Sequence, residues 1–341
     1  MSSVPSFAPS PPSPLSPRSG EKGGVRDEGI SPVGEAVAPP VSGAPPFSPE
    51  RGERGLGGEG ANEGINRLAI VGVGLIGGSI GLAAKAKGAA QHVVGVEANA
   101  DTWADALRIG AVDEITNDLA AGVRGADLVI LAVPVGAILE LLQRLPSLIG
   151  ADTVVTDVGS VKTAIAEAGF AALGERFVPG HPMAGSEKGG VKNARADLFE
   201  AAPWAITPMP QTGKEAQGMV IGFVSALGAN LFGLRPVDHD GSVAWTSHLP
   251  HVLAYTLNAV RAKNRRIVLA LAAGSWKSAT RVAESSPELW TEIALQNAAP
   301  LATALRAFSD ELLAVAAALE TGDTQTIRER FAAGHAAKIR E

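Results

Sequence analysis

A glycine-rich turn between an apolar run and a helix-like segment constrains this chain more than any other feature. Residues 68–71 form a short apolar run of the kind that is buried on both faces of a parallel sheet. The run is followed by a G-x-G-x-x-G pattern made by Gly72, Gly74 and Gly77. In such a pattern the first glycine allows a tight turn, the second lets the backbone approach a pyrophosphate, and the third lets helix and strand pack closely. The sequence therefore predicts a dinucleotide-binding turn.

A second apolar run, residues 93–97, ends in Glu97. An acid near this distance from the glycines binds the adenosine ribose. Because a carboxylate accepts hydrogen bonds from the ribose hydroxyls and repels a 2′-phosphate, the sequence favours NAD over NADP. A structural glycine loop with a surface glutamate is the alternative. The expected cofactor-binding residues lie in the turn, at the acid and at a later strand end: Gly72, Gly74, Leu75, Ile76, Gly77, Glu97 and Pro134.

Strand-like and helix-like patterns alternate from residue 66 onward. Residues 127–134 and 153–157 have the pattern of buried strands, and each is followed by a helix-like segment. This alternation predicts an α/β fold, a Rossmann-type doubly wound parallel sheet whose ligand lies at the carboxyl ends of its strands. Alanine and leucine periodicity then predicts an all-helical C-terminal domain. Its expected helices span residues 214–227, 240–263, 266–273, 287–320 (as one helix or two) and 323–338.

These patterns divide the chain into three segments. Residues 1–64 are rich in proline, serine and glycine and have almost no periodic apolar residues, so we expect them to be disordered. Residues 65–212 form the expected NAD-binding domain. Residues 213–341 form the expected helical domain, which would hold substrate and make a dimer interface.

Composition excludes several classes of function. The chain has no cysteine, so disulfides, thiol nucleophiles and sulfur-ligated zinc are absent. Its formal net charge of −6 gives no electrostatic footprint for nucleic acid. No run reaches the ~18 apolar residues of a membrane span, and the first residues lack the pattern of a secretory signal or an organelle transit peptide. We therefore expect a cytoplasmic protein with neither nucleic acid nor membrane as a partner.

His181 is the first candidate for chemistry outside the glycine turn. It lies between Gly180 and Pro182, in a stretch without helical or strand periodicity, which predicts a rigid loop. With an unperturbed pKa of ~6.5, a histidine can accept or release a proton near neutrality. A solvated loop histidine without function is the alternative.

Further candidates lie in the expected helical domain. Ser247 and His251 are four residues apart and share a helix face, and Pro250 between them predicts a kink. They predict a polar pocket wall, although an ordinary kinked helix fits equally. We expect no metal site, because the H-E-x-x-H pattern is missing. Taken alone, Arg281 reads as a surface residue.

Five short motifs together resemble the prephenate/arogenate dehydrogenase family. They are the glycine turn, G-S-V-K at 159–162, H-P-M-A-G-S-E at 181–187, S-H-L-P-H at 247–251, and T-R-V-A with S-P-x-L-W within 280–290. The resemblance extends from about residue 68 to residue 331. It implies an NAD-linked oxidative decarboxylation in tyrosine biosynthesis, and a homodimer joined through the helical domain.

The resemblance also implies roles for individual residues. Hydride would leave C4 of a cyclohexadienol substrate and CO2 would leave C1, turning prephenate into 4-hydroxyphenylpyruvate or arogenate into tyrosine. His181 would accept the proton of the C4 hydroxyl, and Ser160 would orient His181 and that hydroxyl. Arg281 would bind a substrate carboxylate bidentately. Ser186, Ser247 and His251 would line the pocket, and no metal is needed.

Some features depart from the family pattern or leave alternatives open. Ser278 stands where the family commonly has an aspartate at the pocket mouth. We expect neither a fused chorismate mutase nor a regulatory ACT domain, so feedback by tyrosine would act at the active site. Glu187 gives a weak preference for the ammonium of arogenate, and the choice of substrate stays open. The rival interpretations are a β-hydroxyacid dehydrogenase of the 6-phosphogluconate type, which needs a catalytic lysine, and a non-catalytic NAD-sensing module.

Overall fold

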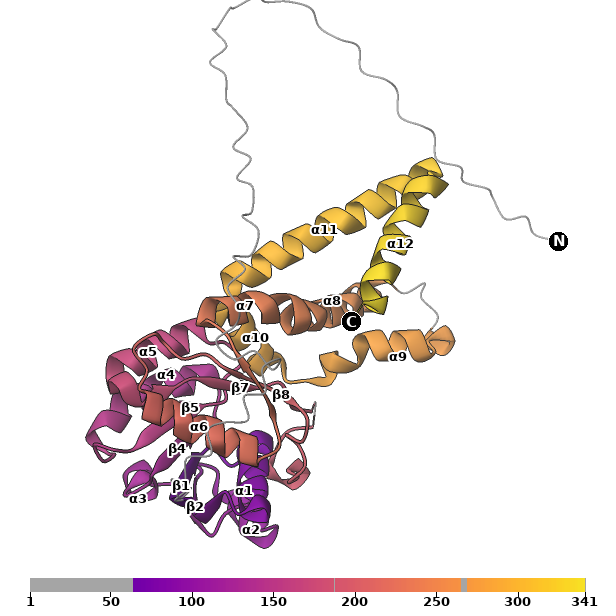
Figure 1. Cartoon of the computed structure of the whole chain (residues 1–341). Coiled ribbons are helices and arrows are strands. Elements are labelled where there is room, and N and C mark those ends of the chain that lie inside the picture. Colours follow the sequence, from indigo (N-terminus) through magenta and orange to yellow (C-terminus); the bar gives the residue numbers. More distant parts are fainter. Residues whose placement is uncertain (1–63, 187, 265–268, 341) are drawn as a thin grey trace, which may run out of the picture. The chain divides into compact units, whose positions relative to one another are not determined.

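The computed structural model describes residues 64–340, apart from 187 and 265–268 (Figure 1). The predicted disordered segment 1–64 lies outside the described residues except for Gly64. All described residues fall within one unit of the chain, Ala44–Glu341.

A six-stranded parallel sheet forms the first half of the described chain and confirms the predicted doubly wound architecture. Its strand order is β3-β2-β1-β4-β5-β6, and the order reverses between β1 and β4. Its strands are β1 (Ile65–Val71), β2 (Ala90–Val96), β3 (Glu114–Thr116), β4 (Leu128–Leu131), β5 (Val154–Asp157) and β6 (Phe177–Val178). All four residues of β4 and of β5 are buried, as expected for strands covered on both faces.

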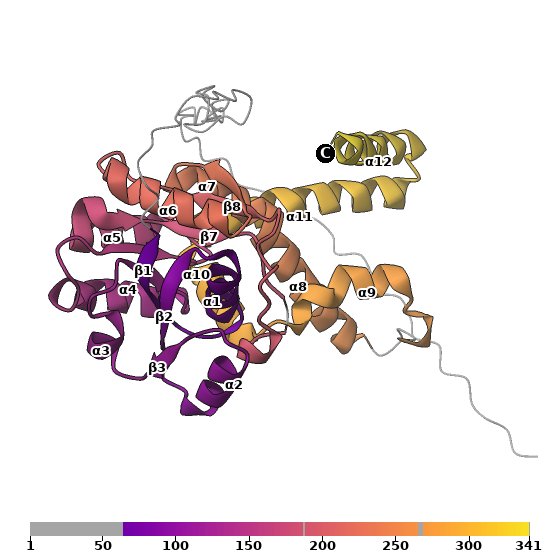
Figure 2. The same ribbon diagram turned by 60° about the horizontal axis from the view of Figure 1, so that its bottom comes forward.

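Helices cover both faces of this sheet (Figure 2). They are α1 (Leu75–Lys87), α2 (Trp103–Arg108), α3 (Leu119–Val123), α4 (Val135–Arg144) and α5 (Thr163–Leu173). One face forms an apolar core with α1 and α2, and the other forms a separate core with α3, α4 and α5. The connections from β1 to β3 therefore cross one face of the sheet, and the connections from β3 to β6 cross the other face.

A second, three-stranded sheet follows and was not predicted from the sequence. It pairs β7 (Gly180–Pro182) antiparallel with β8 (Pro203–Ile206), and β8 parallel with β9 (Asn230–Gly233). The prediction that His181 lies on a loop is therefore wrong, because His181 is the middle residue of β7. A strand of only three residues, here a glycine, a histidine and a proline, is too short for an alternating pattern to be visible.

Helix α6 (Lys214–Ala226) packs against the first half of the chain. Its Val220, Phe223 and Val224 belong to the same apolar core as residues of β1 and β4. Together with β9, this helix extends the α/β part of the structure to Gly233.

The rest of the described chain is helical, as predicted. Its helices are α7 (Pro236–Val243), α8 (Leu249–Lys263), α9 (Gly274–Thr280), α10 (Pro287–Gln296), α11 (Ala298–Thr321) and α12 (Thr324–Ile339). The helix predicted over 240–263 begins earlier, at Pro236, and contains a π turn at Ala244–His248. The π turn precedes Pro250, which has no N–H for a regular helical bond. None of the described helices combines the length and apolar character that a membrane crossing requires.

The remaining predicted helices differ in outcome. The segment predicted over 287–320 is two helices, separated at Asn297, and α11 and α12 then form an antiparallel pair (Figure 1). For the helix predicted over 266–273, the described residues form only a short 3₁₀ turn at Leu269–Leu271, and 266–268 lie outside the described residues. Glu292 of α10 accepts a hydrogen bond from the backbone of Gly136 in α4, which ties the helical part to the sheet.

Candidate functional site

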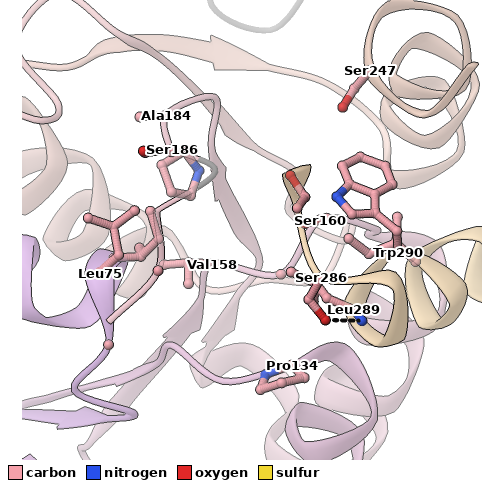
Figure 3. Close-up of a pocket in the computed structure, with 18 of the residues that line it drawn as sticks. Leu75, Pro134, Val158, Ser160, Ala184, Ser186, Ser247, Ser286, Leu289 and Trp290 are labelled. Atoms are coloured by element: carbon pink, nitrogen blue, oxygen red, sulfur yellow. Dashed lines mark hydrogen bonds between the residues drawn. The ribbon is translucent and has the colours of Figure 1, made fainter. Parts of the chain in front are cut away.

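A cavity of ≈ 990 Å³ lies at the carboxyl ends of β1, β4 and β5 (Figure 3). One wall consists of the loops after these strands, together with His181 of β7. The opposite wall comes from the helical part and includes Ser247, His251, Arg281 and Trp290. This is the edge at which doubly wound sheets bind ligands, next to the reversal of strand order.

The glycine turn after β1 forms one edge of the cavity. Gly72 has φ +95°, and a Cβ at Gly77 would lie 1.9 Å from the carbonyl oxygen of Gly72. These two glycines are therefore needed by the turn itself. A Cβ at Gly74 would meet nothing within 4 Å, and Gly74 lines the cavity with Leu75, Ile76 and Pro134. Open space beside this backbone fits a dinucleotide pyrophosphate at the N-terminus of α1.

Glu97 is held beside this turn by backbone hydrogen bonds. Its Oε2 accepts from the N–H of Val73 and its Oε1 from the N–H of Asn99, both at 2.9 Å. The indole of Trp103 donates to the carbonyl of Glu97 at 3.0 Å. The carboxylate therefore has a fixed place at the end of β2, where the acid of a dinucleotide site stands.

His181 faces the cavity and is backed by a line of buried side chains. Its Nδ1 lies 2.9 Å from Nε2 of His239, and Nδ1 of His239 lies 2.8 Å from Oδ1 of Asp240. Asp240 also accepts hydrogen bonds from the backbone N–H groups of Lys162 at 2.7 Å and Thr163 at 2.8 Å. The hydrogen bond that orients His181 thus comes from α7, while Ser160 lines the same cavity.

The surroundings keep His181 neutral. Burial is the main cause that lowers the pKa of His181 well below its usual value of 6.5, and His239, Lys162 and His248 lower it further. Burial opposes the ionisation of Asp240, but hydrogen bonds from His239 and Thr163 and the Lys162 N–H bring its pKa below the usual value. At neutral pH an uncharged imidazole therefore faces the cavity, and a carboxylate lies two groups behind it.

A buried ion pair holds the backbone that precedes His181. Lys162 and Asp157 are both fully buried, and Lys162 Nζ contacts Asp157 Oδ2. Nζ also donates to the carbonyl of Gly180 at 2.8 Å, and Asp157 Oδ1 accepts from the Gly180 N–H at 3.2 Å. Burial lowers the pKa of Lys162, against the opposing effect of Asp157. Because Gly180 is clamped on both sides, His181 has little freedom to shift along β7.

Sequence reasoning assigned no role to His239, Asp240, Asp157 or Lys162. Two signals were present: Asp157 ends a buried strand just before G-S-V-K, and His239 and Asp240 are adjacent at the start of a helix. Neither signal shows that the two places meet, because the contact between them joins Lys162 and Asp240, which are 78 positions apart.

The other predicted site residues lie around the same cavity. Ser160, Ser186, Ser247, His251 and Arg281 all line it, and Figure 3 shows the three serines with Trp290. His251 donates from Nδ1 to the carbonyl of Ser247 at 2.9 Å and stacks on Trp290, with ring centroids 3.4 Å apart. Trp290 therefore also forms part of the cavity wall, although the sequence analysis named it only as part of a motif and gave it no role.

His248 and Ser278, which lie close in sequence to predicted site residues, do not line the cavity. Glu187 is outside the described residues. His248 is buried with Nδ1 3.0 Å from Nδ2 of Asn297, and burial lowers the pKa of His248 to about 4. Ser278 is exposed on α9. Within the described ranges, no group of three or more histidine and acidic side chains is placed to hold a metal ion.

Comparison with known proteins identifies the family. The family model "Prephenate dehydrogenase, nucleotide-binding domain" matches residues 80–232, and "Prephenate dehydrogenase, dimerization domain" matches residues 235–333. A cyclohexadienyl dehydrogenase of Zymomonas mobilis is 34% identical over 283 residues, which are 81% of this chain and 96% of that protein. A prephenate dehydrogenase of Bacillus subtilis is 35% identical over 242 residues, which are 69% of this chain and 65% of that protein.

A solved structure has the same fold. The prephenate dehydrogenase of Aquifex aeolicus, crystallised with hydroxyphenyl propionate and NAD+, superposes with a TM-score of 0.77. It is 27% identical, and the match covers 82% of this chain and 99% of that chain. Both parts of the described chain are thus matched in sequence and in architecture, and the chain belongs to the prephenate dehydrogenase family.

Proposed function

We propose that this protein catalyses the NAD-dependent oxidative decarboxylation of prephenate, of arogenate or of both, in tyrosine biosynthesis. The observation that carries the proposal is the neutral His181 facing a ≈ 990 Å³ cavity that also contains the glycine turn and Arg281. A proton acceptor, a dinucleotide turn and a guanidinium around one space are the groups this reaction needs. A non-catalytic NAD sensor would need neither His181 nor Arg281.

His181 is the general base of the proposed reaction. When the C4 hydroxyl is oxidised, its proton passes to the neutral imidazole of His181. In this proposal Ser160, which lines the cavity beside the strand end, contacts the same hydroxyl. NAD, when bound, supplies the hydride acceptor. Loss of CO2 makes the ring aromatic, which drives the reaction without a metal.

The opposite wall binds the rest of the substrate. Arg281 is the cation there, and a guanidinium recognises a carboxylate through two parallel hydrogen bonds. Ser247, His251 and Ser186 supply further polar groups. The stacked pair of His251 and Trp290 gives this wall a rigid flat surface against which a six-membered ring can lie.

The cofactor is NAD, bound by the glycine turn and by Glu97. Gly74 leaves room for the pyrophosphate, and Leu75, Ile76 and Pro134 line the adjoining cavity. Glu97 favours NAD because its carboxylate, already fixed by two backbone N–H groups, would repel a 2′-phosphate.

The protein acts in the cytoplasm as a symmetric homodimer joined through its helical domain. The support is a set of exposed apolar side chains on α11 and α12: Leu312 at 55%, Leu313 at 66%, Leu319 at 61%, Phe331 at 63% and Ile339 at 72%. Such residues mark an interaction surface. A monomer by light scattering at micromolar concentration would contradict the dimer.

We place the border between the two domains near residue 234, because α6 and β9 pack with the sheet.

The function is tested by incubating the protein with NAD and, in separate reactions, prephenate and arogenate. NADH absorbance and released CO2 should rise together in equal amounts with at least one of them. The faster substrate tells whether the side chain should carry a keto group or an ammonium. Absence of NADH with both substrates would contradict the proposal, and turnover of a β-hydroxyacid instead would favour the rival dehydrogenase.

A further inference from the structure

His181, His239 and Asp240 form a line of three hydrogen-bonded side chains, of which His181 is the one that lines the cavity. His181 faces the cavity, whereas His239 is 1% exposed and Asp240 is 4% exposed. The two imidazole rings meet edge to face, with centroids 5.1 Å apart and an interplanar angle of 64°. The two nitrogen contacts in this line are 2.9 Å and 2.8 Å long, so each is a hydrogen bond that needs one donor and one acceptor.

The carboxylate at the inner end decides where the protons lie. Asp240 is ionised and can only accept, so Nδ1 of His239 carries a proton and donates it. A neutral imidazole has a single N–H, which leaves Nε2 of His239 as an acceptor. Nδ1 of His181 must then be the donor in the second bond, and Nε2 of His181 is left without a proton.

None of the other described charged groups near His181 can fix the proton positions in this line as Asp240 does. His181 is faced by Lys162 from the segment before α5 and by His248 from the π turn, while His251 and Arg281 stand on the other wall. Asp157 at the end of β5 is engaged by Lys162. Among the described groups around His181, Asp240 is thus the carboxylate that is connected to the histidine through a hydrogen-bonded ring.

We propose that His239 and Asp240 are a positioning pair for His181. They hold it in the form with a proton on Nδ1 and a bare Nε2 toward the substrate, and the negative charge of Asp240 stabilises the positive charge that His181 gains. The inference rests on the proposed role of His181 as the base. When the substrate O–H bond breaks, the N–H bond forms at Nε2, and the Nδ1 proton stays in the bond to His239.

The proton positions can be observed directly in the wild-type protein. With ¹⁵N-labelled histidine, NMR at neutral pH should show a protonated Nδ1 and a bare Nε2 for His181, assigned with His181→Asn. A protonated Nε2 at His181 would overturn the proposal. This measurement needs no turnover, so it stands even where the protein fails to oxidise prephenate or arogenate, an outcome that would count against the proposed function alone.

Two variants separate the effects of orientation and charge. His239→Phe keeps a ring in place and leaves Asp240 its two backbone bonds, but it removes the acceptor for Nδ1 of His181. We expect kcat to fall about 100-fold, at the lower end of what a positioned base contributes. KM and the NAD dissociation constant should change less than about 2-fold, because neither ligand touches this side chain.

Asp240→Asn keeps an oxygen acceptor for His239 but removes the negative charge. We expect kcat to fall about 10-fold. The acidic limb of its pH profile should move to lower pH, because an imidazolium loses its counter-charge. The matched control is Asp238→Asn, on the same helix, where an exposed carboxylate is paired with Arg235. A wild-type kcat and pH profile in both His239→Phe and Asp240→Asn would overturn the pair. An equal loss in Asp238→Asn would also overturn it.

Discussion

The two halves of the described chain bury their apolar residues to different extents. The sheet half has a large apolar core on each face, built from strands and from helices α1 to α6. The cluster in the helical half centres on three buried residues, Leu249, Leu301 and Ala304. Meanwhile Leu295 of α10 is 71% exposed, and α11 and α12 expose several more large apolar residues. The first half thus completes its own core, whereas the second presents apolar surface that fits a partner subunit.

The halves also differ in how they carry function. The sheet half offers backbone: the turn from Gly72 to Gly77 and the N–H groups that fix Glu97. The helical half offers side chains, among them Arg281 and the stacked His251 and Trp290. Changes in the first half should therefore act on the cofactor and changes in the second on the substrate, with His181 between them affecting the chemistry alone.

The largest effect is expected at His181. His181→Asn keeps a polar side chain but cannot take up the proton, so turnover should fall by about 10²- to 10⁴-fold while NAD affinity is kept. In the wild type, the rate should drop as pH falls through the pKa of His181, and that limb lies well below pH 6.5 because the pKa is lowered. The limb should vanish in the variant, and His92→Asn on β2 should behave as wild type. If the Asn variant retains turnover and the limb, the base lies elsewhere.

Two glycines of the turn sharpen the claim that the sheet half acts through its backbone. In Gly77→Ala the new methyl would overlap the carbonyl of Gly72, so we expect a loss of about 1–3 kcal/mol in the free energy of unfolding. Gly74→Ala meets no protein atom within 4 Å, so the fold should keep its stability while NAD binding weakens. Thermal unfolding and NAD titration of both variants test this. If Gly77→Ala and Gly74→Ala destabilised the protein equally, the assignment of Gly77 to the fold and of Gly74 to NAD binding would be wrong.

Arg281→Lys tests whether the helical half acts on the substrate. The variant keeps the charge but loses the planar fork, and one lost charge-assisted hydrogen bond corresponds to about a 10-fold rise in KM for prephenate. NAD affinity should be unchanged, as should all parameters of Arg306→Lys, an exposed control on α11. An unaltered KM for prephenate would mean that Arg281 does not contact the substrate.

The smallest effect is expected at Glu97. Glu97→Ser removes the repulsion of a 2′-phosphate, so the preference for NAD over NADP should narrow by several-fold through a lower KM for NADP. The control is Glu140→Ser, an exposed position on α4. Equal use of NAD and NADP by the unmodified protein would remove Glu97 from this role.

The parts of the fold that sequence predicted are those with local patterns. Buried parallel strands such as β4 are continuous apolar runs, and the turn after β1 has its glycines at fixed spacing. The three-stranded sheet was missed because β7 has three residues and its partner β8 begins 23 residues later than β7. Its pairing depends on long-range hydrogen bonds, which leave little periodic signal in so short a segment.

The candidate site divides in the same way. Residues within continuous motifs, such as Ser160, His181 and His251, were identified, and the structure brings them to one cavity. The residues behind them were missed because their importance depends on contacts between segments. His239 acts on a side chain 58 positions earlier, and Asp240 binds the backbone of residues more than 70 positions earlier. Chain folding creates these relations, and no spacing rule encodes them.

Because of the π turn, the position of one cavity wall depends on the exact number of residues between α7 and α8. In the π turn the N–H of Leu249 bonds to the carbonyl of Ala244, so this turn contains one residue more than a regular α-helical turn. Each residue of an α-helix turns by about 100°. Deleting one residue here would therefore restore a regular helix but rotate all of α8 by about that angle. His251 would leave the cavity, and Tyr255 would lose its 2.7 Å hydrogen bond to the carbonyl of Ser285. In the evolution of this segment, a single-codon deletion should therefore be rarer than the replacement of an exposed side chain.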